Sequence, residues 1–270
     1  MDVTTRTLDV PGAKLYYEVR GSGPPLLLVG SPMESMFFAG MADALAVDRT
    51  VVTYDPRGIS DSSVEDPDRQ VTPEDQGDDV HAIIEAVGNG PAEVFGSSGG
   101  ACTGLALVSR HPGDVRTLVA HEPPITCFLP DAAEVDAIGD EVVETYRTAG
   151  SAAAFRRFMA MAGFEAPGDP GEAPQLPPPN PDQERNDRHF FLGLFRTTMR
   201  YRPDVEALQS VATRIVVGVG EDSGEQLPAR TGRATAAAIG APVVEFPGRH
   251  AGFLERPEPF LEKLRTVLGS

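Results

Sequence analysis

The sequence predicts an α/β fold built on a mostly parallel sheet of about eight strands. Short apolar runs alternate with helical segments, and residues 25–29 are apolar throughout, as expected of a strand covered on both faces. Between about 130 and 205 no strand pattern occurs, and a proline-rich stretch lies at 174–181. We therefore expect a core domain of residues 1–129 and 206–270, interrupted after the sixth strand by a helical insertion of residues 130–205.

The strands are predicted in chain order from runs rich in apolar and β-branched residues. The first two form a hairpin, because Pro11 and Gly12 between them favour a turn. The predicted strands are residues 3–10, 14–20, 25–29, 50–54, 92–96, 115–120, 214–219 and 243–246. The helices predicted between and after them are residues 35–47, 74–88, 99–111, 227–239 and 253–268. In such a sheet, reactive groups gather beyond the carboxyl ends of the strands.

Composition excludes several classes of function. The chain has 270 residues and a formal net charge of −17, which disfavours binding to nucleic acid or to anionic membranes. No apolar run approaches the roughly 20 residues that span a bilayer, and the N-terminus lacks the pattern of a signal peptide. Two cysteines, Cys102 and Cys127, are better suited to a reducing compartment than to a disulfide framework. These features predict a soluble cytoplasmic protein.

The most informative motif surrounds Ser98. Gly96-Ser97-Ser98-Gly99-Gly100 follows a predicted strand directly and opens a predicted helix. A sharp turn of this kind exposes a serine hydroxyl beside backbone N–H groups, and only glycine fits where the strand and the helix pass closest. Side chains at Gly96 and Gly100 would collide there. The pattern alone also fits a glycine-rich turn or a weak phosphate loop, but its position between strand and helix favours a nucleophile.

A serine nucleophile needs a base, and one histidine is suitably placed. His250 follows the last predicted strand, in a loop at the same edge of the sheet as Ser98. His81 lies within a predicted helix, and His111 is expected to cap the helix that starts after Ser98. His121 ends a strand and His189 lies in the insertion. His250 is therefore the predicted base.

Four segments together resemble the α/β-hydrolase superfamily over nearly the whole chain. They are Leu26-Leu-Leu-Val-Gly-Ser-Pro, Tyr54-Asp-Pro-Arg-Gly-Ile-Ser-Asp-Ser, Gly96-Ser-Ser-Gly-Gly and Arg249-His-Ala-Gly-Phe. The resemblance implies an α/β-hydrolase fold with a helical cap inserted after strand 6. It also implies that Asp55 and Arg57 belong to a structural loop, and we assign them no catalytic role.

The third member of a triad departs from the usual pattern. These hydrolases usually place an acid three residues beyond the glycine that ends the seventh strand, where this chain has Ser223. The neighbours Asp222 and Glu221 could shift into that place, and the fold also permits an acid after the sixth strand, at Glu122. The serine motif, the His-Glu-x-Pro turn at 121–124 and the missing later acid resemble the zearalenone lactonase group. That resemblance implies that Glu122 orients His250, and Asp222 is the alternative.

The loops near Ser98 and the insertion suggest where an oxyanion and a substrate would bind. One N–H donor should come from Gly99 and the other from the loop after the third strand, where Ser31 is the first choice and Met33 the second because Pro32 has no N–H. In the insertion, two apolar groups are expected to pack together and to line a pocket as a lid. They are Phe155, Phe158, Met159, Met161 and Phe164, and Phe190, Phe191, Leu194, Phe195 and Met199.

These observations predict a serine hydrolase that cleaves a hydrophobic carboxylic ester or lactone through an acyl-enzyme, with water as the second substrate. The mechanism implies no metal and no cofactor. Haloalkane dehalogenase and epoxide hydrolase activities are disfavoured, since they need an aspartate in place of Ser98. Three alternatives stay open: a thioesterase, a carbon–carbon bond hydrolase with the same triad, and a ligand-binding protein without activity. The chain is expected to be a monomer or a homodimer.

Overall fold

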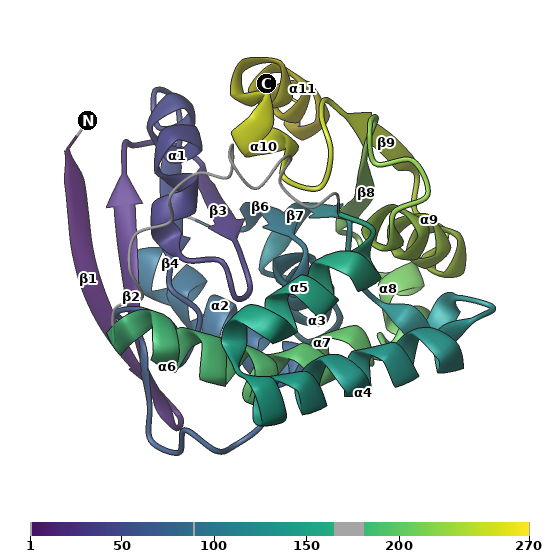
Figure 1. The fold of residues 1–270 in the computed structure, drawn as a ribbon. Coiled ribbons are helices and arrows are strands. Elements are labelled where there is room, and N and C mark those ends of the chain that lie inside the picture. Colours follow the sequence, from purple (N-terminus) through teal and green to yellow (C-terminus); the bar gives the residue numbers. More distant parts are fainter. Residues whose placement is uncertain (1, 89, 165–180, 270) are drawn as a thin grey trace.

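The computed structural model describes residues 2–88, 90–164 and 181–269 and contains the predicted mixed sheet (Figure 1). Its strand order is β1-β2-β4-β3-β6-β7-β8-β9, with a short β5 paired to β2. β1 and β2 pair antiparallel with each other, and β2 pairs antiparallel with β4. Along the rest of the sheet, from β4 through β3, β6, β7 and β8 to β9, every pairing is parallel. The strands are β1 Val3–Val10, β2 Ala13–Arg20, β3 Pro25–Val29, β4 Thr50–Tyr54, β5 Ser63–Val64, β6 Ala92–Ser97, β7 Val115–His121, β8 Arg214–Gly220 and β9 Val243–Phe246.

All eight predicted strands are present within one residue of their expected bounds. The two-residue β5 is the addition, so the strand expected as the sixth is β7. The apolar run in β3 is explained by its position in the middle of the sheet. Leu27 and Val29 pack into the hydrophobic core on one face, whereas Leu26 and Leu28 pack into the core on the other.

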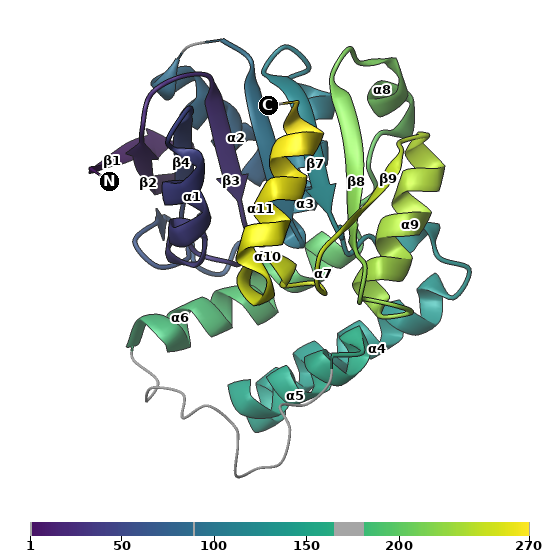
Figure 2. The ribbon, with the colours of Figure 1, turned by 90° about the horizontal axis from the view of Figure 1, so that it is seen from above.

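Helices cover both faces of the sheet (Figure 2). Those that contribute to the first core are α2 Pro73–Val87, α3 Gly99–Arg110, α8 Val205–Ser210 and α9 Leu227–Ile239. Those that contribute to the second are α1 Ala39–Leu45, α10 Gly252–Glu255 and α11 Pro257–Leu268. The core therefore has three layers, with the sheet between two layers of helices.

Two predicted helices are divided in the structure. The helix expected over 35–47 begins as a 3₁₀ turn, Ser35–Phe38, before α1. The prediction of a single helix over 253–268 was wrong, because Arg256 adopts a non-helical conformation between α10 and α11. Pro257 disfavours helical geometry in the residue before it and suits the first position of a new helix.

The insertion lies beyond the carboxyl ends of the parallel strands (Figure 2). It follows a 3₁₀ turn, Thr126–Phe128, and contains α4 Ala132–Ala149, α5 Ser151–Ala162, α6 Pro181–His189, a π-helical turn Phe190–Leu194 and α7 Phe195–Met199. None of the described residues between 130 and 205 forms a strand. Most of the proline-rich stretch, residues 174–180, lies outside the described residues.

Most members of the two apolar groups of the insertion pack into one cluster, as the sequence predicts, but Met159 and Phe164 do not belong to it. Phe155 lies against Phe191 with ring centroids 4.8 Å apart, and Phe158 lies against Phe195 at 5.7 Å. Leu194 departs from the group and packs against Ile59 in a small separate cluster. In the part of the chain that the structure describes, no helix has the length and apolar composition to cross a bilayer.

Candidate active site

Ser98 occupies the sharp turn between β6 and α3. Its φ of +57° is rare for a residue with a side chain, and such strain is held only where the surroundings fix it. A Cβ on Gly96 would overlap the carbonyl oxygen of Gly100, and one on Gly100 would overlap that of Val29. The predicted need for glycine at both positions is confirmed. Among the described residues, the Ser98 hydroxyl has no hydrogen-bond partner, and Ser98 lines a cavity.

His250 lies in the turn between β9 and α10 and lines the same cavity as Ser98. Its Nδ1 hydrogen-bonds Oε2 of Glu122 at 2.7 Å, which leaves Nε2 for another partner. The ring also stacks on Phe164, with centroids 5.3 Å apart. A carboxylate on Nδ1 and an aromatic face against the ring together fix its orientation.

Glu122 stands directly after β7 and is fully buried. Its φ of +48° is a second strained position, and Pro123 and Pro124 stiffen the turn that follows. The N–H of Gly220 donates to Oε1 at 2.9 Å, while Oε2 holds His250. Burial alone would raise the pKa of this carboxyl group, but the hydrogen bond and charge of His250 lower it to about 2. Glu122 is therefore ionised at neutral pH.

The alternative acid lies elsewhere. Asp222 and Glu221 have side chains that are 58% and 42% exposed, and both carboxylates face the guanidinium of Arg256. Ser223, in the usual position of the acid, is buried. Its hydroxyl helps to lower the pKa of Glu122, although it makes no hydrogen bond of good geometry. Of the carboxylates weighed from the sequence, it is Glu122 that holds His250.

The loop after β3 closes the other side of Ser98. Gly99 packs directly on the Ser31 backbone, where a Cβ would overlap the Ser31 carbonyl oxygen. Both residues line the cavity, as does Met33. Gln76 on α2 donates to Ser31 Oγ at 3.0 Å and accepts from Thr103 Oγ1 at 2.8 Å. This hydrogen-bonded chain ties the loop to α2 and α3.

Gln76 was missed in the reasoning from sequence. It is buried, as are Pro73, Gly77 and Asp79 near it, while the polar Glu74 and Asp75 are partly buried. A glutamine within a predicted helix gives no sign of where its amide points. Its contact with Ser31 depends on the packing of α2 beside the loop after β3, which the sequence does not specify.

The cavity beside Ser98 has a volume of about 270 Å³. Besides the residues already placed around Ser98, its walls come mostly from the insertion, with Pro124 and α9 adding to them. The apolar residues of these walls are Pro124, Phe155, Phe158, Met161, Ala162, Phe164, Phe190, Leu194, Phe195, Met199, Leu227 and Pro228. Apart from these, the insertion contributes one polar side chain, Thr198. The cavity therefore suits a ligand with an apolar body.

The remaining residues named from the sequence have structural surroundings. Asp55 accepts from the N–H groups of Ser35 and Asp61, and Arg57 forms a double hydrogen bond with Asp79. Cys102 is buried, Cys127 is half-buried, and both are free thiols.

Two histidines are enclosed in the protein interior. His121 is fully buried, and burial lowers its pKa to about 4, so its ring is neutral. His189 is also buried, and burial lowers its pKa as well. His81 and His111 lie at the opposite end of α3 from Ser98.

Comparison with known proteins places this geometry in a family. The family model described as alpha/beta hydrolase fold matches residues 24–162. The chain belongs to the α/β-hydrolase family. It is 32% identical over 275 residues to the uncharacterized hydrolase YraK of Bacillus subtilis. This alignment covers 99% of this chain and 97% of that protein.

Three further proteins are similar to part or all of the chain. Zearalenone hydrolase of Bionectria ochroleuca is 30% identical over 145 residues, which cover 52% of this chain and 54% of that protein. A hydrolase from Pseudomonas aeruginosa superposes with a TM-score of 0.74 over 98% of both chains at 24% identity. A putative epoxide hydrolase from the same organism gives a TM-score of 0.71 at 20% identity, covering 98% of this chain and 95% of that one. At these identities the two structures show the shared fold.

Proposed function

We propose that this α/β hydrolase cleaves hydrophobic carboxylic esters or lactones through an acyl-enzyme on Ser98. The observation that carries the proposal is the buried, ionised Glu122 on Nδ1 of His250, with His250 and Ser98 lining one apolar cavity. A carboxylate on Nδ1 fixes the tautomer in which Nε2 can accept a proton, which is what a base for serine requires. The insertion, residues 130–205, would act as the lid of this cavity.

The reaction would proceed in two acyl transfers. Nε2 of His250 takes the proton of Ser98 as Oγ attacks the acyl carbonyl carbon, and the oxyanion is held by the N–H groups of Gly99 and Ser31, with Met33 as the alternative donor. His250 then gives that proton to the leaving alkoxide, which departs as an alcohol. A water molecule, deprotonated by His250, attacks the acyl-enzyme, and the carboxylic acid leaves as Ser98 regains its proton. In a lactone the alcohol and the acid are parts of one hydroxy acid.

The apolar wall favours a hydrophobic substrate. Its aromatic and methionine side chains offer no charged partner for a polar acyl group, so binding energy would come from buried apolar surface. The partial similarity to zearalenone hydrolase makes a macrocyclic lactone the first compound to try. The substrate class is the part of the proposal that depends on this wall.

The chemistry and the substrate class are tested separately. A fluorophosphonate should label wild-type protein on Ser98 and should not label Ser98→Ala, with peptide mass mapping as the readout. Turnover of p-nitrophenyl butyrate should be lost in Ser98→Ala and kept in Asp222→Asn, which alters an exposed carboxylate outside the cavity. A well-folded wild-type protein with neither labelling nor turnover would instead be a ligand-binding relative. A panel of macrolactones, long-chain esters and thioesters then ranks the substrates by kcat/KM.

A further inference from the structure

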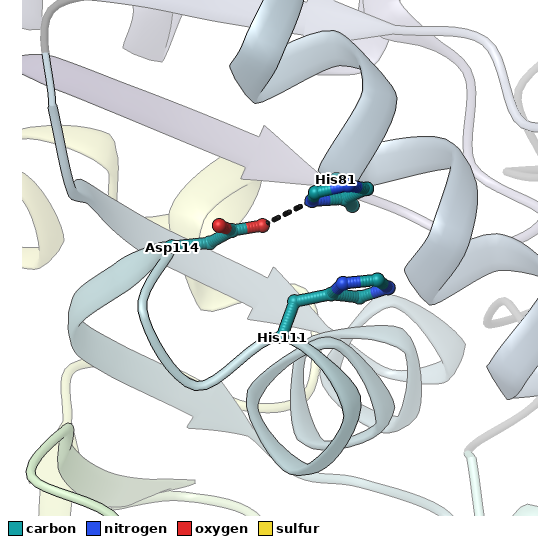
Figure 3. A group of neighbouring side chains, drawn as sticks. All are labelled: His81, His111 and Asp114. Atoms are coloured by element: carbon teal, nitrogen blue, oxygen red, sulfur yellow. Dashed lines mark hydrogen bonds and ion pairs between the residues drawn. The ribbon is translucent and has the colours of Figure 1, made fainter.

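Two histidines and an aspartate form a compact group far from Ser98. His81 projects from α2, His111 ends α3, and Asp114 stands directly before β7 (Figure 3). One potential ligand atom from each lies within 4.8 Å of the others. Since α3 begins after Ser98 and has 12 residues, about 18 Å of helix separates this group from the candidate active site.

The two imidazole rings lie face to face. Their centroids are 3.8 Å apart and their planes differ by 5°. Asp114 Oδ2 is 2.6 Å from His81 Nδ1, and Asp78 Oδ1 is 2.8 Å from His111 Nε2. Figure 3 shows the Asp114 carboxylate pointing to the edge of the His81 ring, with His111 beneath.

The surroundings favour a cation. Asp78, Asp114 and Glu85 contribute three carboxylates, with Glu85 Oε2 3.5 Å from His81 Nε2. The guanidinium of Arg110 forms a double hydrogen bond with Asp78. The three carboxylates and this guanidinium sum to a net negative charge. The last carbonyl groups of α3 add to it, because the C-terminal end of a helix carries partial negative charge.

We propose that His81, His111 and Asp114 bind a divalent transition metal, with Zn²⁺ as the best match. Two imidazoles and one carboxylate are donors that zinc prefers, and a water molecule or Asp78 would complete four-coordination. The metal would link α2, the end of α3 and the start of β7. It would act as a structural cross-link and take no part in the chemistry at Ser98.

Binding requires a small local adjustment. Ligand atoms of a tetrahedral zinc ion lie about 3.3 Å apart, given metal–ligand distances of about 2.0–2.1 Å. His81 Nδ1 and Asp114 Oδ2 must therefore separate from 2.6 Å, and the parallel rings must turn so that their lone pairs converge. The three side chains are 20–28% exposed, so they can turn toward solvent. Zinc binding changes the tautomer of His81: Nδ1 gives its proton to water, and Nε2, 3.5 Å from Glu85 Oε2, takes a proton from water. The neutral ring then offers its Nδ1 lone pair to the metal.

The test uses the full chain after removal of metals with a chelator. Isothermal titration with Zn²⁺ should give one ion per chain, and the melting temperature should rise with zinc concentration because only the folded state has the site. His111→Phe keeps an aromatic ring stacked on His81 but removes the ligand, so it should abolish both effects. Asp114→Asn should weaken zinc affinity at least about tenfold, the lower end of what losing a partner of a metal ligand costs.

Control variants decide the location. His250→Ala removes a partly exposed imidazole at the other end of α3 and should retain one zinc per chain. Far-ultraviolet circular dichroism verifies that each variant is folded. The proposal is overturned if wild-type protein binds no zinc, or if the folded His111→Phe and His81→Phe variants bind it as well as wild type. Since the readouts are binding and melting temperature, failure of the esterase proposal would leave this result unaffected.

Discussion

Two imidazole–carboxylate pairs of almost the same length, one at each end of α3, have very different surroundings. His250 and Glu122 are 2.7 Å apart, and His81 and Asp114 are 2.6 Å apart. The Glu122 side chain is fully buried and takes a second hydrogen bond from the Gly220 N–H, whereas the Asp114 side chain is 20% exposed. His250 shares an apolar cavity with a serine and has the His121 ring 6.3 Å away, while the His81 ring lies only 3.8 Å from that of His111.

An imidazole–carboxylate contact does not by itself determine the chemistry. A carboxylate on an imidazole fixes a tautomer in both places, but proton transfer also needs a nucleophile beside the other nitrogen and little water. The two ends of α3 reinforce the difference. Its N-terminal end presents N–H groups that suit an oxyanion, and its C-terminal end presents carbonyl groups that suit a cation.

Substituting the carboxylate of each pair should produce the strongest contrast, because one substitution should lower kcat and the other should weaken zinc binding. Glu122→Gln should lower kcat for p-nitrophenyl butyrate about 10³–10⁴-fold, because an amide cannot stabilise the imidazolium or hold the required tautomer. The same variant should bind zinc as wild type does, whereas Asp114→Asn should bind it more weakly. Asp222→Asn is the control for activity. A loss of turnover in Asp222→Asn as large as in Glu122→Gln would reverse the assignment of the acid.

The second prediction is that a carboxylate at position 223 can replace the one at position 122. Ser223 is buried next to Glu122, in the position where the family usually has its acid. In the Glu122→Gln background, Ser223→Asp should recover at least about tenfold of the lost kcat, since a new carboxylate could reach His250 from β8. Ser223→Asn in the same background is the uncharged control. If Ser223→Asn recovered as much kcat as Ser223→Asp, the recovery would not come from the carboxylate charge.

The third prediction concerns stability in acid. The pKa of Glu122 is about 2 in the folded protein against an ordinary 4.5, so the unfolded chain binds more protons between these values. This contribution to stability is present above about pH 4.5 and is lost as the pH falls toward 2. It should be on the order of a few kcal/mol. Urea unfolding at pH 6 and pH 3 should show a smaller loss of stability in Glu122→Gln than in wild type, and equal losses would contradict the prediction.

The smallest effect should come from α2, the helix that reaches both ends of α3. It sends Gln76 to Ser31 and His81 to the distant cluster. Thr103→Val removes the hydroxyl that holds Gln76, which should cost about 1–3 kcal/mol of stability and lower kcat only a few-fold. Thr148→Val, on the exposed face of α4, is the matched control. A loss of kcat like that of Glu122→Gln would mean that Gln76 has a role in the chemistry itself.

The sequence predicted the core of the fold well because local patterns and global packing agree there. The apolar run in β3 could be satisfied only in the middle of a covered sheet, and the glycines around Ser98 fit only a close strand-to-helix contact. The single helix predicted over 253–268 failed at a local signal, Pro257, whose effect on Arg256 was overlooked. The cluster at His81 and His111 was not foreseen, since their residue numbers gave no reason to place them together.

By itself the sequence determined the order of strands and helices, the turn at Ser98 and the types of side chain available for chemistry. These follow from periodicity, from glycine and proline, and from residue chemistry, all of which act over a few neighbouring residues. The tertiary structure decided which carboxylate meets His250, what holds Ser31, and that His81 lies on His111. Each of these is a contact between residues at least 30 positions apart in the sequence. Such contacts are set by how the helices and strands pack, which no local pattern specifies.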